Sequence, residues 1–164
     1  MLEFLFDTTR AVVNLVLNGT VARHPNIAFI VPHAGATLPV IADRVTAFAL
    51  VLADVEAGTD VMRDLARLHY VLAGFPLPRQ LDALLTITTL DHLHYGSDYP
   101  FTPDSVVDML VAQLGEAGTP AGSLSEALSD NTRRPFTAVA KRFADEHNDA
   151  CAADDHSNRP PRHA

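Results

Sequence analysis

The sequence predicts an α/β fold in which a parallel sheet is covered by helices. Three observations support this: short apolar runs typical of buried strands, amphipathic helical segments between them, and a strand–helix order that repeats three times. Rossmann-type sheets and TIM barrels both show this pattern. Three strands cannot close a barrel, which typically takes about 250 residues. In a barrel, this chain of 164 residues would therefore hold about the last three strands.

The first predicted helix covers residues 8–21, where apolar side chains recur at steps of three and four residues. Asp7 or Thr8 is the expected N-cap, and Gly19 lies near the end of this helix. The first predicted strand is Ile27–Val31, a continuous apolar run typical of a strand buried on both faces. This pair of elements begins the alternation.

The remaining elements continue it. In order they are helices over residues 37–55 and 61–68, a strand at 69–73, a helix at 79–85, a strand at 92–95, and a helix from Thr102 or Pro103 to Leu114. Further helical periodicity covers Ser123–Glu146, and residues 147–164 are a polar mixture with little to bury. We therefore expect one partial barrel domain over residues 1–146 and a disordered tail over 147–164.

Composition argues against several partners and locations. The formal net charge of −8 and the pI near 5.3 disfavour nucleic acids and anionic membranes, which bind clustered Lys and Arg. Cys151 is the single cysteine, so no disulfide framework can form and a cytoplasmic location is expected. No apolar stretch reaches the roughly 20 residues that cross a bilayer.

His33 is the first candidate for chemistry. It follows the strand predicted at 27–31 in the segment Val-Pro-His-Ala-Gly, whose Gly35 allows a tight turn. Polar residues at the carboxyl ends of parallel strands line the sites of barrels and open α/β sheets. His33 is therefore predicted to face a site, although a helix cap or a bond to a loop carbonyl explains it as well.

Asp98 is a second and stronger candidate. It follows the strand predicted at 92–95, between a Gly-Ser turn and the segment Tyr99–Phe101. A carboxylate held at this position can provide an oxygen ligand to a divalent cation. The structural alternative is that Asp98 caps the next helix, but Thr102 is better placed for that.

His92 and His94 have the His-X-His spacing of many metal sites. They begin their predicted strand, so they lie toward the end of the sheet opposite to Asp98, where barrel residues serve stability. We interpret them as surface or interstrand histidines. Phe75, in the loop after the second strand, and Tyr99 are candidates for a substrate wall, although a loop plug explains Phe75 equally.

Four segments resemble the amidohydrolase-related family. They are Phe4–Arg10, Pro25–Leu38, Leu72–Gln80 and Tyr95–Phe101, the last reading Tyr-Gly-Ser-Asp-Tyr-Pro-Phe. The best fit is its decarboxylase branch, which includes the aminocarboxymuconate-semialdehyde, γ-resorcylate and 6-methylsalicylate decarboxylases. The resemblance covers roughly residues 2–143. It implies the C-terminal part of a metal-dependent TIM (β/α)8 barrel with about three parallel strands and flanking helices.

The family pattern implies roles for two residues. His33 matches the sixth-strand histidine, which acts near the metal as an acid/base or polarising group. Asp98 matches the eighth-strand metal ligand. The family's first-strand His-X-His pair and fifth-strand histidine have no counterpart here. The resemblance implies a small carboxylic acid substrate and one divalent metal, Zn or Mn, which this fragment holds weakly or not at all.

Met1–Phe4 resembles the interior of the family pattern, so we expect a truncated sequence. Missing neighbouring strands would leave apolar edges exposed, so homo-oligomers are also expected. Where the family commonly has a second glycine, this sequence has Ala36. We expect this difference to alter the backbone beside His33.

Three functions remain open. The first is non-oxidative decarboxylation of a small aromatic or unsaturated carboxylic acid, which rests on the resemblance alone. The second is metal-dependent hydrolysis of an ester, amide or lactone, which uses the same parts. The third is no catalysis at all, as a truncated remnant or half of a split barrel, because three of the family's four metal ligands are missing.

Overall fold

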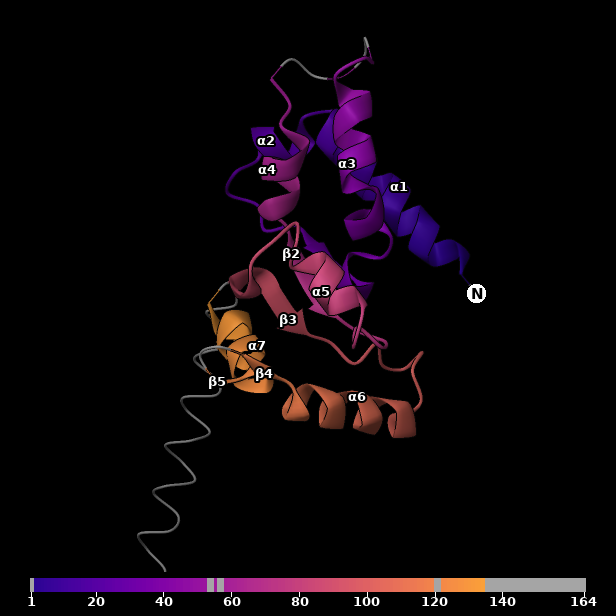
Figure 1. The fold of residues 1–164 in the computed structure, drawn as a ribbon, viewed down its shortest axis with the longest axis vertical. Helices are drawn as coiled ribbons and strands as arrows, with labels where there is room; N and C mark the ends of the chain where they lie inside the picture. Colours follow the sequence, from indigo (N-terminus) through magenta and orange to yellow (C-terminus); the bar gives the residue numbers. More distant parts are fainter. Residues whose placement is uncertain (1, 53–54, 56–57, 120–121, 135–164) are drawn as a thin grey trace, which may run out of the picture. The chain divides into compact units, whose positions relative to one another are not determined.

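A computed structural model describes residues 2–52, 55, 58–119 and 122–134 (Figure 1). The chain divides into two compact units, Met1–Asn131 and Thr132–Ala164. The described residues of the second unit are Thr132–Arg134. The helical pattern expected beyond residue 134 and the tail expected over 147–164 lie outside the described residues.

The elements alternate between helix and strand as predicted. In order they are α1 (Glu3–Leu17), α2 (Thr20–Arg23), β1 (Ile30–Val31), the 3-10 turn η1 (His33–Gly35), α3 (Leu38–Ala49), α4 (Val61–Ala66), β2 (His69–Leu72), α5 (Gln80–Leu84), η2 (Leu90–His92), β3 (Leu93–Tyr95), α6 (Asp104–Glu116), β4 (Gly118–Thr119), β5 (Gly122–Ser123) and α7 (Leu124–Arg133). The short antiparallel pair β4–β5 was not predicted.

The main sheet has the order β1-β2-β3, and both pairings are parallel. Ile30 pairs with His69, and Tyr70 pairs with Leu93, so all three strands point their carboxyl ends the same way. This confirms the predicted parallel sheet. It also brings the segments that follow β1 and β3 to one edge, on either side of the segment that follows β2.

Helix α1 begins five residues before its predicted start, so the predicted N-cap was wrong. Asp7 and Thr8 lie inside the helix, where Asp7 forms an ion pair with Arg10. The buried Thr9 hydroxyl donates to the Leu5 carbonyl at 2.8 Å. Polar residues that favour caps are tolerated within a helix when they bond along it.

Two other predicted elements are shorter than expected. The first strand covers Ile30–Val31 only, and it is not buried on both faces: Ile27 and Ile30 are 55% and 41% exposed. As an edge strand of the described sheet, β1 has a partner on one side only. Helix α3 ends at Ala49 instead of residue 55, and Leu50 and Val51 beyond it are exposed.

The core lies between the sheet and the helices. Its fully buried members include Val16 of α1, Leu38 of α3, and Tyr70 and Leu72 of β2. The Tyr70 hydroxyl donates to the Leu65 carbonyl at 2.8 Å, which satisfies its buried polar atom. The same burial raises the pKa of Tyr70, so the phenol stays protonated.

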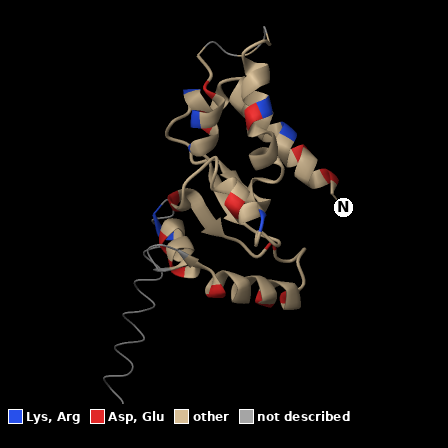
Figure 2. Cartoon of the chain, in the orientation of Figure 1, with Lys and Arg blue, Asp and Glu red and all other residues tan. Residues whose placement is uncertain are grey.

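Asn131 connects helix α7 to η2 and β3 through hydrogen bonds. Its buried amide donates to the carbonyls of Leu90 and Leu93 at 2.6 and 2.9 Å. One side chain thus satisfies the first carbonyl of η2 and the first carbonyl of β3. Helix α6, which follows Asp98, has acidic residues and no Lys or Arg (Figure 2). Among the residues that the structure describes, no helix is both long and apolar enough to cross a bilayer.

Candidate active site

The two predicted site residues come together at the carboxyl edge of the sheet. His33 opens η1 directly after β1, and Asp98 follows β3. The His33 Nε2 atom lies 3.8 Å from Asp98 Oδ1, and the two side chains are 19% and 34% exposed. The pair therefore forms across the central strand, at an edge that solvent reaches.

The distance between these atoms is too long for a hydrogen bond but short enough for an ion pair when the imidazole is protonated. On the other side of the ring, His33 Nδ1 is buried without a hydrogen-bond partner in the described chain. Nε2 is thus the ring atom turned toward Asp98, and it remains able to donate to or accept from a third group.

Both residues have backbones that L-amino acids rarely adopt. The described non-glycine residues with positive φ are His33, Ala34, Ala36 and Asp98, at 50° to 60°. Such conformations cost about 1–3 kcal/mol each and cluster at active sites, where the surrounding structure enforces them. The outliers are the two candidate residues, His33 and Asp98, and two neighbours of His33. Backbone strain therefore supports a site here independently of the residue types.

Phe4 packs against the histidine from the first turn of α1. Its ring centroid lies 4.8 Å from that of His33, with the planes at 56°. Tilted contacts between aromatic rings are favourable, so this contact stabilises the observed orientation of the imidazole. Phe4 was not among the predicted site residues because the helix was expected to begin at Thr8, although the family resemblance included this segment.

Thr102 supports the aspartate instead of capping the next helix. Its hydroxyl donates to Asp98 Oδ2 at 3.2 Å, and its backbone N–H donates to the Asp98 carbonyl at 3.0 Å. Pro103 occupies the N-cap position of α6, and neither Asp98 nor Thr102 caps that helix. The predicted cap was therefore wrong, because the Thr102 hydroxyl bonds backward to the site carboxylate.

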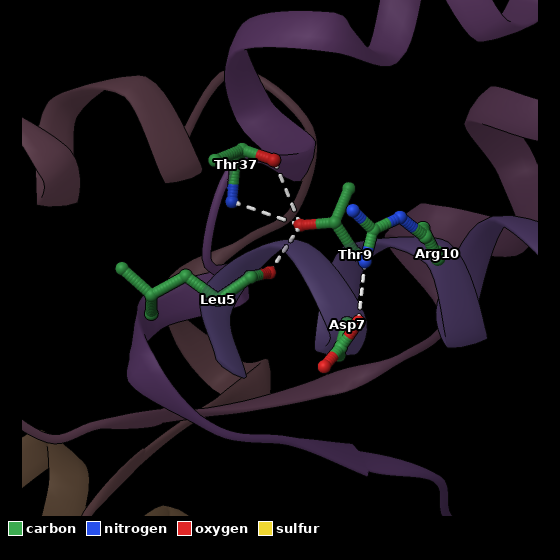
Figure 3. Close-up of polar contacts among 5 residues, drawn as sticks. All are labelled: Leu5, Asp7, Thr9, Arg10 and Thr37. Atoms are coloured by element: carbon green, nitrogen blue, oxygen red, sulfur yellow. Dashed lines mark hydrogen bonds and ion pairs between the residues drawn. The ribbon is translucent and has the colours of Figure 1, made fainter. Parts of the chain in front are cut away.

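The turn that carries His33 is held from two sides. From α1, the Thr9 hydroxyl accepts from the Thr37 N–H at 3.2 Å and bonds the Thr37 hydroxyl at 2.7 Å (Figure 3). From α5, the Gln80 side-chain amide donates to the carbonyls of His33 and Ala36 at 2.9 and 3.1 Å. These long-range contacts had no signal in the sequence, because the bonded residues lie 28 to 47 positions apart.

Two glycines permit close packing beside the site. Gly35 has φ +80°, and a β-carbon there would lie 3.2 Å from the Tyr70 ring. At Gly96, a β-carbon would lie 2.2 Å from Val71 Cγ1, which is a clash. The turn after β1 and the exit from β3 can therefore approach β2 only because these residues lack side chains.

The predicted substrate wall stays a prediction. Phe75 lies in the loop after β2 and is 50% exposed, while Tyr99 lies next to Asp98 and is 72% exposed. Both follow strand ends at the edge that carries His33 and Asp98. Their rings are thus available to a ligand at this edge.

His92 precedes β3, at the end of the strand opposite to Asp98, and His94 is the middle residue of β3; both histidines bond within the protein. His94 is buried, and its Nε2 lies 2.8 Å from His69 Nδ1. His92 stacks on His69 with ring centroids 4.8 Å apart, and its Nδ1 bonds the Leu68 carbonyl at 3.0 Å. These contacts are those of interstrand histidines.

Asp98 fits one position of a divalent metal site. Thr102 holds Oδ2, while Oδ1 points toward His33 and accepts no hydrogen bond within the described residues. In the same part of the chain, no three His, Cys, Asp or Glu side chains form a group that could hold a metal. Tight binding needs several preformed ligands, so the described residues fit one ligand of a site and not a complete one.

Two cavities lie away from the pair. One of about 170 Å³ is lined by Tyr95 and residues of α6 and α7, and one of about 250 Å³ lies beside His69 and His92. Neither brings together strained backbone and candidate catalytic groups. Geometry and chemistry therefore favour the open edge at His33 and Asp98 over either cavity.

Comparison with known protein sequences gives consistent matches. The profile of a family described as amidohydrolase matches residues 5–137. Decarboxylase macB of Penicillium terrestre is 26% identical over 130 residues, which are 77% of this chain and 38% of macB. The 6-methylsalicylic acid decarboxylase of Penicillium expansum is 28% identical over 109 residues, 65% of this chain and 34% of that protein. The chain thus spans well under half the length of each relative.

Solved structures agree. A crystal structure of an amidohydrolase II is 34% identical with a TM-score of 0.74, covering 83% of this chain and 44% of its own. The 5-carboxyvanillate decarboxylase of Novosphingobium aromaticivorans, solved with manganese and 4-hydroxy-3-methoxy-5-nitrobenzoic acid, is 17% identical with a TM-score of 0.70. It covers 82% of this chain and 40% of its own, and at this identity it shows the fold alone. The three parallel strands and their helices are thus part of a TIM barrel, as predicted.

Proposed function

This chain belongs to the amidohydrolase family, and on that premise we propose that it forms the part of a metal-dependent decarboxylase barrel that provides the proton donor and one metal ligand. The proposed reaction is non-oxidative decarboxylation of a small aromatic carboxylic acid. In this proposal His33 handles the proton and Asp98 binds the metal. The relatives named as decarboxylases support the reaction class.

The observation that carries the proposal is the His33–Asp98 pair. An imidazole nitrogen and a carboxylate oxygen face each other at 3.8 Å, at the carboxyl edge of the sheet, on two strained backbones. A proton donor and a metal ligand placed this closely can act on one small molecule. Phe4 and Thr102 limit the freedom of the two side chains from outside the pair.

The residues divide the proposed chemistry as follows. When bound, a divalent cation supplies positive charge that polarises the oxygens of the substrate. Asp98 Oδ1 is the oxygen available to hold it. His33 Nε2 presents a proton to the ring carbon that bears the carboxylate. As the bond between that carbon and the carboxylate breaks, CO₂ leaves, and the electron pair left on the ring carbon takes the proton from Nε2.

Hydrolysis is the less favoured alternative. It would use the same aspartate and histidine, but the matched relatives are named decarboxylases. Decarboxylation is therefore the function to test first.

The experiment measures metal content and CO₂ release from salicylate-type acids after equilibration with Zn²⁺ or Mn²⁺. Alone, the 164-residue chain is expected to hold less than one metal per chain and to release no CO₂, because Asp98 is one ligand among several that are needed. Combined with a polypeptide that supplies the remaining barrel strands and ligands, it is expected to do both. Ester and lactone substrates in the same assay test hydrolysis.

Substitutions separate the two roles in the active assembly. Asp98→Asn should lower metal content, whereas His33→Asn should keep the metal and slow decarboxylation about 100-fold or more. Asp91→Asn and His24→Asn are matched controls at exposed positions away from the edge, and both should behave as wild type. Unchanged CO₂ release from the His33 variant would remove the proposed proton donor.

A further inference from the structure

We propose that Gln80 is a positioning residue that locks the left-handed turn His33–Ala36 and thereby fixes the direction of the His33 imidazole. The inference rests on the proposed function only for the role of the imidazole as a proton donor. Gln80 lies outside the His33–Asp98 pair, 47 residues from His33 in sequence. Its side chain contacts the backbone of the turn.

The contact is made by one amide group on two carbonyl groups. Gln80 Nε2 lies 2.9 Å from the His33 carbonyl oxygen and 3.1 Å from that of Ala36. Both acceptors are backbone oxygens, so the group that faces them must be the –NH₂ and not the amide oxygen. Its two N–H donors are thus shared between the first and last residues of the turn.

The turn needs such support because its own conformation is unfavourable. His33, Ala34 and Ala36 have φ values of 55°, 50° and 53°, and Ala36 combines this with ψ −117°, a region that favours glycine. Within the turn, the Ala36 N–H donates to the His33 carbonyl at 2.8 Å. The Gln80 amide donates to this His33 carbonyl and to the Ala36 carbonyl. It therefore stabilises the strained conformation of the turn relative to extended ones.

The position of Gln80 is itself well determined. It is the first residue of α5, and the Leu81 N–H beside it donates to the Pro76 carbonyl at 2.8 Å. Leu81 and Leu84 of the same helix are buried in the core. Leu84 also lies against the turn, 3.4 Å from where a β-carbon of Gly35 would stand. A side chain anchored in this way can hold a loop in place.

The consequence for His33 follows from its backbone. The side-chain direction of a residue changes when φ moves from the left-handed to the extended region, because the Cα–Cβ bond turns with the peptide planes. Without Gln80, the imidazole is expected to leave its contact with Phe4 and its approach to Asp98. A displacement of about 1 Å at a reacting group can cost about 100-fold in rate.

The test compares variants of Gln80 in the full chain by NMR. Gln80→Met keeps the length of the side chain and removes the donors, whereas Gln80→Lys keeps N–H donors at similar reach. Gln80→Asn, which withdraws the amide by one carbon, is a milder second variant if the Met variant fails to fold. Gln113→Met is the matched control, since Gln113 lies on α6 with its Oε1 buried and unbonded.

The expected result is local. In Gln80→Met, the intraresidue HN–Hα contacts and couplings that mark positive φ should be lost at His33 and Ala36, while Gln80→Lys and Gln113→Met keep them. In the active assembly, kcat should fall about 100-fold with KM little changed, and Lys should restore it. Positive φ retained in Gln80→Met, or lost equally in Gln113→Met, would overturn the inference.

The two proposals can fail separately. If the wild-type assembly releases no CO₂ but the turn relaxes in Gln80→Met, the proposed function is wrong and the positioning role of Gln80 stands. If CO₂ is released and Gln80→Met changes neither the turn nor kcat, the function stands and Gln80 has no positioning role.

Discussion

Backbone strain is concentrated at the residues that carry the proposed chemistry. Among the described non-glycine residues, positive φ occurs at His33, Ala34, Ala36 and Asp98. Ala36, which the family resemblance places at a glycine position, has a conformation that glycine adopts more easily. The effect of Ala36 on the backbone beside His33 stays a prediction, and in this structure Gln80 contacts the carbonyls of both residues.

At the residue scale, Gly35→Ala should destabilise the chain more than an equivalent change elsewhere. A methyl group at Gly35 meets both a positive φ and the Tyr70 ring at 3.2 Å, so a loss of about 3 kcal/mol is expected. Gly58→Ala is the matched control, because φ is +83° there with nothing within 4 Å, and about 1 kcal/mol is expected. Urea unfolding of both variants measures the difference, and equal losses would contradict the packing argument.

Elements position the site through their ends. The pair forms because β1 and β3 flank β2 in a parallel sheet, so the segments after them lie at one edge. Helices then hold these segments: α1 supplies Phe4 and Thr9, and α5 supplies Gln80. The strand–helix pattern predicted which segments share the edge, while the contacts of the helices with the turn were not predicted.

At the element scale, Gly96→Ala should disturb the exit of β3 through a clash with one side chain. The new β-carbon would lie 2.2 Å from Val71 Cγ1, so about 2 kcal/mol of stability should be lost and Asp98, two residues on, displaced. In a Val71→Ala background the same substitution should cost less, because the clashing atom is gone. A double-mutant cycle by chemical denaturation measures this coupling, expected at about 1–2 kcal/mol. A coupling near zero would show that the clash is relieved elsewhere.

At the scale of the whole molecule, the two ends of the sheet carry different groups of residues. The carboxyl edge carries the strained pair, and the opposite end carries His69, His92 and His94, which bond and stack with one another. The predicted oligomerisation also belongs to this scale and stays a prediction. Apolar side chains exposed near the end of α3 are consistent with it; they are Phe48, Leu50, Val51 and Leu52.

The histidine cluster predicts how global stability depends on pH. Burial, and secondly the charge of His92, lower the pKa of His69 below its ordinary value of 6.5. At this residue the unfolded chain therefore binds more protons, so the contribution of His69 to stability is fully present above about pH 6.5 and is lost as the pH drops below it. Free energies of unfolding between pH 7.5 and 5 measure this.

In His69→Gln, the part of this pH dependence that comes from His69 should disappear, because the side chain no longer titrates. His24→Gln, at an exposed position in the turn after α2, should keep the wild-type slope. A His69 variant that follows the wild-type curve throughout would show that the cluster does not govern acid stability.

The α/β class, the parallel direction of the three strands, and the positions of His33 and Asp98 after the first and third strands could all be predicted from the sequence. These features are local, because apolar periodicity marks each strand and its end can be read from the residues that follow. Two features became visible only in the folded chain: Nε2 of the histidine faces Oδ1 of the aspartate, and Phe4 and Gln80 contact the histidine. These contacts join residues 29 to 65 positions apart, and their geometry depends on how close β2 lets its neighbours approach.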